Sequence, residues 1–151
     1  MTGTNFSDWF NATEGTMVAT ASVFQTGVSF PPVFVVWDGT TQNQMRISLV
    51  SSTLTRRFSV TTLNAGQADF NGGNLGNFAK DLPFTIAGAY KNNDFAGAAG
   101  GGAVSTDTVG TVPTVNSATF GLFNSYLNGH IKKIAYYPVR LSDANIQALT
   151  T

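Results

Sequence analysis

Apolar and polar residues alternate along most of the chain, with the period of two that is typical of a β-strand with one buried face. Residues 33–37 differ, because Val-Phe-Val-Val-Trp is apolar on both faces, as in a strand covered from two sides. Short strands about ten residues apart, with no helical pattern between them, predict an all-β sandwich. The alternating segments are residues 17–24, 45–49, 57–61, 84–90 and 118–122.

Glycine-rich and asparagine-rich turns separate these segments. The glycine-rich run 97–103 lacks the spacing of a phosphate-binding loop, and we expect it to connect two strands as a hairpin. One helix is predicted, at the end of the chain. Ser142 is a favourable N-cap for it, and Leu141 and Ile146 have the spacing of a hydrophobic staple.

Composition narrows the class of protein. The chain has 151 residues and no cysteine, a length that buries a sizeable core without disulfides or metal. No linker or shift in composition divides it, so residues 1–151 are expected to form one domain.

Eight basic and eight acidic residues cancel, and nucleic-acid binders normally carry a basic surplus. No apolar stretch reaches the ~18 residues of a membrane span. From the balanced charge we expect no nucleic-acid partner, and from the short apolar stretches we expect no membrane partner.

The last predicted strand and the helix after it follow a recognisable order. A small polar turn and Gly129 open the strand, an isoleucine and tyrosine pattern runs through it, and Leu-Ser opens the helix. Residues 127–149 thereby resemble the ending of concanavalin A-like, laminin-G-like domains. The resemblance implies a two-sheet antiparallel jelly-roll sandwich with one short C-terminal helix. The break in alternation between Ile131 and Ile134 predicts a β-bulge.

Three further segments, residues 6–11, 14–18 and 82–90, are similar to such domains in tailed-bacteriophage virion proteins. The resemblance implies a module on the virion surface, either in a tail fibre or as a capsid decoration. Its partners would be other virion proteins and host or environmental glycans, and a homotrimer would suit either position. Two alternatives remain open: a purely structural decoration protein that recognises no sugar, and a secreted bacterial lectin.

Catalysis is not expected. Glucanases of this fold carry a Glu-x-Asp-x-x-Glu strand, because retaining hydrolysis needs two carboxyl groups about 5–5.5 Å apart. Glu14 is the only glutamate here, and the aspartates are scattered, which leaves an inverting pair from distant loops as the remaining catalytic alternative. His130, the only histidine, has no nucleophile motif around it, and we expect a structural or exposed role for it.

Sugar binding requires an aromatic platform beside planar amide or carboxylate groups. Trp37 is also explained by core packing, because it ends the most apolar strand. The candidate platforms are Trp37, Tyr90 and Tyr126, and the candidate polar partners are Asn43, Asn92 and Asp94.

No cofactor is expected. Calcium is the one metal that the sequence brings into consideration, because it prefers carboxylate and amide oxygens. The suitable side chains do not follow the Asp-x-Asp-x-Asp spacing of a calcium loop, so turn formation is the favoured explanation for them. They are Asp38, Asn92, Asn93, Asp94 and Asp107.

Overall fold

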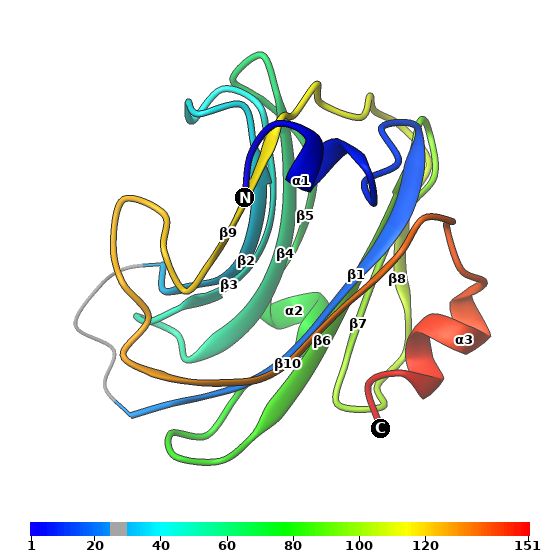
Figure 1. The fold of residues 1–151 in the computed structure, drawn as a ribbon. Helices are drawn as coiled ribbons and strands as arrows, with labels where there is room; N and C mark the ends of the chain where they lie inside the picture. Colours follow the sequence, from blue (N-terminus) through cyan, green and yellow to red (C-terminus); the bar gives the residue numbers. More distant parts are fainter. Residues whose placement is uncertain (25–29) are drawn as a thin grey trace.

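The computed structural model describes residues 1–24 and 30–151, in which two antiparallel five-stranded sheets pack face to face (Figure 1). The β1 sheet contains, in spatial order, β10 (Gly129–Tyr137), β1 (Glu14–Val23), β6 (Phe84–Lys91), β7 (Phe95–Ala99) and β8 (Ser105–Asp107). The β3 sheet contains β5 (Ala65–Phe70), β4 (Thr55–Thr62), β3 (Gln44–Val50), β2 (Pro32–Trp37) and β9 (Ser117–Phe120). The predicted all-β jelly-roll sandwich is confirmed.

The core lies between the two sheets and is built from the inward positions that alternation predicts. In β3, Met45, Ile47 and Leu49 are fully buried, whereas Arg46 between them projects from the opposite face. Residues 33–36 of β2 are buried on both faces, as predicted for a doubly covered strand. The inward residues of the other strands include Met17, Ala19, Ala21, Val23, Phe58, Val60, Phe84, Ile86 and Tyr90.

The helix α3 (Asp143–Ala148) covers the outer face of the β1 sheet (Figure 1). The Ser142 hydroxyl accepts a hydrogen bond from the Asn145 amide at 3.4 Å, which is the predicted N-cap. Ile146 is fully buried in a cluster with Leu141 and with alanines of β6 and β7. Among the described residues, no helix has the length and apolarity needed to cross a membrane.

There are two single-turn helices: α1 (Thr4–Ser7) precedes β1, and α2 (Gly72–Leu75) lies in the connection between β5 and β6. The sequence did not predict them, because four residues are too few to display a helical period. The predicted hairpin joins β7 to β8, with Gly100 and Gly101 at positive φ in its turn. The predicted bulge is also present. Thr20 of β1 pairs with Lys133 of β10 and Ala21 pairs with Ile131, so Lys132 is the extra residue.

Candidate functional site

The six residues predicted for sugar binding are not gathered in one place. Tyr90 is fully buried, and its hydroxyl donates to the Asn11 carbonyl at 2.6 Å, so its ring offers no stacking face to solvent. Tyr126 lies in the β9–β10 connection and is 76% exposed. Trp37 ends β2 with its ring edge-on to Phe123, at a centroid distance of 5.1 Å.

The three polar residues predicted for sugar binding form hydrogen bonds or ion pairs that hold loops in place. The Asn43 side chain donates to the Asp38 carboxylate at 2.8 Å and accepts from the Leu63 amide at 3.0 Å. The Asn92 side chain accepts from the Val112 amide at 2.7 Å. Asp94 forms an ion pair with Arg140. Each of these groups therefore has a structural partner in the fold.

The residues considered for calcium also form turns. The Asp38 carboxylate accepts from the Thr40 amide at 2.8 Å and from the Thr40 hydroxyl at 2.6 Å. The Thr40 hydroxyl, followed by the Asn43 amide, lowers the pKa of Asp38 below its ordinary value. In residues 1–24 and 30–151, no three His, Cys, Asp or Glu side chains lie close enough to hold a metal ion together.

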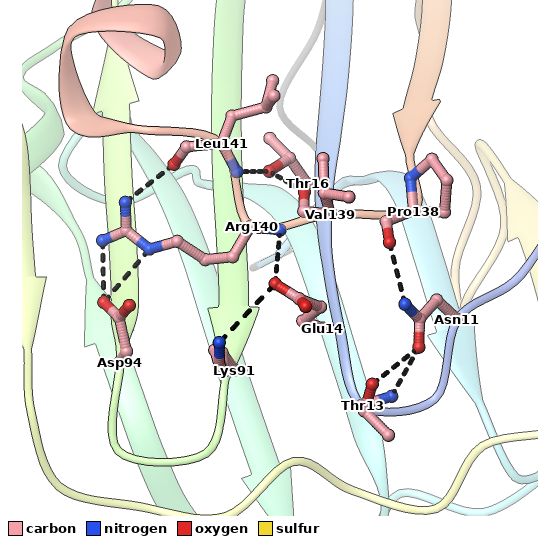
Figure 2. A network of polar contacts seen from close by, with 10 residues as sticks. All are labelled: Asn11, Thr13, Glu14, Thr16, Lys91, Asp94, Pro138, Val139, Arg140 and Leu141. Carbon is pink, nitrogen blue, oxygen red and sulfur yellow. Dashed lines mark hydrogen bonds and ion pairs between the residues drawn. The ribbon is translucent and has the colours of Figure 1, made fainter.

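The network around Arg140 fixes the chain between β10 and α3 (Figure 2). The guanidinium contacts Asp94 at 2.8 Å, the Leu141 carbonyl at 2.7 Å and Asp143 at 2.6 Å. The backbone amide of Arg140 donates to the Glu14 carboxylate at 3.1 Å. Because these contacts are internal and the Arg140 side chain is 10% exposed, the network holds α3 in place.

A different concentration of polar groups lies on the β3 sheet, on the face turned away from the core. The strand register explains it, because residues paired across neighbouring antiparallel strands share a face. Arg46 pairs with Ser59, and Ser59 pairs with Asp69. We call the following side chains the polar face: Trp37, Gln44, Arg46, Ser48, Arg57, Ser59, Asp69 and Ser117.

A surface pocket of about 510 Å³ opens at the β4–β5 side of the polar face. Arg57 and Asp69 line it and form a bidentate pair, with nitrogen–oxygen distances of 2.7 and 2.9 Å. Phe30, 42% exposed, supplies an aromatic ring, which lies 5.1 Å from the Arg57 guanidinium. We call this the Phe30 pocket; its lining residues are Phe30, Val50, Thr53, Thr55, Arg57, Asp69, Asn71, Gly72 and Gly73.

The two glycines of the pocket have different surroundings. A side chain on Gly72 would collide with Thr55, so glycine is needed there for α2 to approach β4. A Cβ on Gly73 would meet no atom within 4 Å. The backbone at Gly73 therefore borders open space at the pocket wall.

Aromatic rings and arginines alternate from the pocket across the polar face. The Arg46 guanidinium lies 5.7 Å from the centroid of the Phe30 ring and 5.2 Å from that of the Phe123 ring. Phe123 in turn packs on Trp37. The face thus combines cation–π contacts, a bidentate ion pair and hydroxyl groups, and two arginines against one aspartate leave it with net positive charge.

The sequence analysis missed Arg46, Arg57 and Asp69 as site residues. The alternation of apolar and polar residues placed Arg46 and Arg57 on the face of their strands turned away from the core, and this was the one sequence signal that pointed to them. Phe30 and Phe123 come from loops, and a strand pattern does not predict where loop side chains lie. The convergence of these groups therefore became visible only in the folded chain.

No family model matches the sequence, and no curated protein matches it. The fold is similar to a solved structure of the Ruminococcus gnavus IT-sialidase CBM40 bound to α2,3-sialyllactose, with a TM-score of 0.73 and 15% sequence identity, over 93% of this chain and 84% of that one. It is also similar to part of the leech intramolecular trans-sialidase, with a TM-score of 0.71 and 16% identity, over 93% of this chain and 23% of the enzyme. The K499G mutant of NanB sialidase from Streptococcus pneumoniae gives a TM-score of 0.70 and 17% identity, over 91% of this chain and 24% of that one. At these identities the likeness shows a shared β-sandwich fold.

Proposed function

We propose that this protein is a non-catalytic carbohydrate-binding module and that it binds sugar in the Phe30 pocket. The observation that carries the proposal is the combination of groups in that pocket. An exposed aromatic ring lies beside the bidentate Arg57–Asp69 pair, with the Asn71 side chain and two threonine hydroxyls around it. The volume of about 510 Å³ falls in the range of small-ligand sites.

This set of groups suits the hydroxyls of a sugar. Each sugar hydroxyl both donates and accepts a hydrogen bond, and the pocket offers donors on Arg57 and acceptors on Asp69. The ion pair fixes both planar groups, so little side-chain entropy is lost when a ligand forms bonds to them. Phe30 supplies a flat apolar surface for the carbon–hydrogen face of a sugar ring.

The structural neighbours support the same class of function. They include CBM40 carbohydrate-binding modules solved with α2,3- and α2,6-sialyllactose, and this chain spans 84% and 85% of those two chains. Asp69 is the only carboxylate among the residues that line the pocket, whereas glycoside hydrolysis generally uses two. A binding role thus fits the pocket better than a hydrolytic one.

The experiment is a glycan-array screen followed by titration calorimetry on soluble hits, starting with lactose and sialyllactose. A Cβ at Gly73 meets no atom within 4 Å, so we expect Gly73→Gln to place a side chain in the pocket and to reduce affinity at least tenfold. Gly66→Gln is the matched control, because Gly66 also has open space around it and lies outside the pocket. Tyr126→Ala tests the exposed platform in the β9–β10 connection. Binding that survives Gly73→Gln and disappears in Tyr126→Ala would overturn the pocket assignment, and an array without any hit would overturn the function.

The place of the module is a separate proposal: we propose that it is carried on the surface of a tailed-phage particle, in a fibre or as a decoration. The resemblance of residues 6–11, 14–18 and 82–90 to such domains of phage virion proteins is the support for it. Proteomics of purified particles and light scattering of the isolated protein would test it. Absence from the particle contradicts the location, and a monomer contradicts the expected trimer.

A further inference from the structure

One strip of the polar face contains buried polar atoms that have no partner, and Phe123 packs on two of its residues, Trp37 and Arg46; we call it the strip beneath Phe123. They are the indole Nε1 of Trp37, the side-chain oxygen of Gln44, the Nε of Arg46 and the hydroxyl of Ser48. Within the described residues these four are the complete set of such buried, unpartnered side-chain atoms, and all of them project from one face of two neighbouring strands. A buried polar atom without a partner costs about 1–3 kcal/mol, so a cluster of four requires an explanation.

Arg46 is the charged member of this strip. Its guanidinium forms no hydrogen bond and no ion pair with any described residue, and it makes cation–π contacts with the rings of Phe30 and Phe123. Asp69, the nearest acidic residue on the polar face, is bound at both oxygens by Arg57. Arg46 is thus a half-buried cation whose Nε has no partner among the described residues, and the one carboxylate of the polar face, Asp69, is already paired with Arg57.

The cover over this strip is a short loop segment. Phe123, 6% exposed, lies in the connection between β9 and β10, where the Phe123 amide donates to the Ser125 carbonyl and the Leu127 amide to the Gly121 carbonyl. These bonds close the loop on itself. Among the described residues, one backbone bond, from the Gly121 amide to the Val33 carbonyl, ties its start to β2, and another, from the Phe24 amide to the Asn128 carbonyl, ties its end to the segment after β1. Displacing Phe123 therefore requires few bonds to the sheet to break.

We propose that the strip beneath Phe123 is a covered subsite for an anionic group of the ligand, in which Arg46 binds a carboxylate or sulfate and Phe123 is displaced on binding. The inference deepens the proposed function, since the strip continues the Phe30 pocket across Phe30 and Arg46. The ligand class follows from the unpaired cation: an anion satisfies the Arg46 donors, while the Trp37 Nε1–H and the Ser48 hydroxyl donate to its remaining oxygens. A neutral sugar would leave the charge of Arg46 without a partner.

The test uses nuclear magnetic resonance, because the Arg46 Nε–H, the Trp37 indole N–H and the Asn71 side-chain amide each give a separate signal. Sodium sulfate, sialyllactose and lactose are titrated at constant ionic strength. We expect sulfate and sialyllactose to shift the Arg46 and Trp37 signals, and lactose to shift only the Asn71 signal. Arg46→Gln should abolish the sulfate response and lower the affinity for sialyllactose about tenfold, to the level of lactose. Lys132→Gln, which removes an exposed charge on β10, should change neither.

Phe123→Ala tests the cover. Removing the ring removes the cost of displacing it, so we expect a roughly fivefold higher affinity for sialyllactose, while Phe123→Tyr keeps the wild-type value. Unmoved Arg46 and Trp37 signals in the presence of both anions would overturn the subsite. If lactose still shifts Asn71 in that case, the proposed function stands without it. If sulfate shifts Arg46 and no sugar shifts Asn71, the subsite stands and the sugar-binding pocket fails.

Discussion

The hydroxyl oxygens of Tyr90 and Tyr136 lie 2.7 Å apart and tie the middle of the β1 sheet to its edge. Tyr90 donates to the Asn11 carbonyl at 2.6 Å, and the Asn11 amide donates to the Tyr136 hydroxyl at 2.9 Å. The pair lies directly against Gly15, where an added Cβ would come within 2.6 Å of the Tyr90 oxygen. The N-terminal segment is thereby anchored to two strands by one set of bonds.

Tyr90→Phe removes the centre of this set and leaves buried partners unsatisfied. We expect the free energy of unfolding to fall by about 1–2 kcal/mol in urea denaturation. Tyr137→Phe is the control, because no hydrogen bond of the Tyr137 hydroxyl occurs among the described residues. An equal loss in the two variants would show that the hydrogen bonds of Tyr90 do not stabilise the fold.

The same tyrosine predicts a dependence on alkaline pH. Burial, followed by the hydrogen bond to Tyr136, raises the pKa of Tyr90 well above its ordinary value of 10.0. The unfolded chain therefore releases this proton at a lower pH than the folded chain, so the contribution of Tyr90 is complete below pH 10 and declines above it. We expect the stability of the wild-type protein to fall more steeply between about pH 10 and 11 than that of Tyr90→Phe. Parallel curves from urea titrations at several pH values would contradict this.

Arg46→Met should stabilise the fold. Burial, with the charge of Arg57 as a second cause, lowers the pKa of Arg46 to about 10, which reflects a charge placed where water solvates it poorly. Replacing it by an apolar side chain of similar length is expected to raise the free energy of unfolding by about 1 kcal/mol. The gain should be constant through neutral pH, where Arg46 is charged, and should shrink above a pH of about 10 as the wild-type residue loses its proton.

Arg57→Met provides the contrast for that experiment. Arg57 has a carboxylate partner in Asp69, so its loss should lower the free energy of unfolding by about 1 kcal/mol or less, given the exposure of Asp69. Opposite signs for the two variants would separate a paired from an unpaired arginine on one sheet face. If Arg46→Met also lowers stability, Arg46 has a favourable contribution that its contacts do not explain.

Gly88→Ala should be among the most damaging single-methyl changes in the protein. Gly88 lies in β6 directly over the Phe58 ring, and a Cβ there would overlap the ring atoms. Because both sheets are fixed by their own ladders, the ring has little room to move, and we expect a loss of about 3 kcal/mol or more in thermal or urea unfolding. Gly66→Ala in β5 meets no atom within 4 Å and should be neutral or slightly stabilising. Similar stability of the two variants would show that the sheets separate easily.

Arg140→Gln should loosen α3. The variant loses contacts to Asp94, Asp143 and the Leu141 carbonyl, and we expect a decrease of about 2 kcal/mol together with faster amide exchange in residues 143–148. Arg140→Lys should restore only part of this, because an ammonium group cannot reach all three acceptors in the geometry of the guanidinium. Full rescue by lysine would show that charge alone holds the helix.

Much of the fold followed from local patterns in the chain. Alternation along residues 45–49 fixed which side chains of β3 enter the core, because successive strand residues point to opposite faces. Ser142 with Ile146 predicted the start of α3, since an N-cap and its staple lie within a few residues of each other. The interrupted alternation at Ile131 and Ile134 predicted the bulge, because an extra residue in a strand shifts the alternation of the residues that follow it.

The candidate site was decided by the tertiary structure. Arg46, Arg57 and Asp69 are separated along the chain and meet only because β3, β4 and β5 pair in a particular register. Phe30 and Phe123 complete the site from loops, whose side-chain positions depend on the elements around them. Sequence by itself determined which faces are buried, because burial follows a short repeating pattern. Which polar groups converge depends on contacts between distant segments, and only the folded chain specifies those.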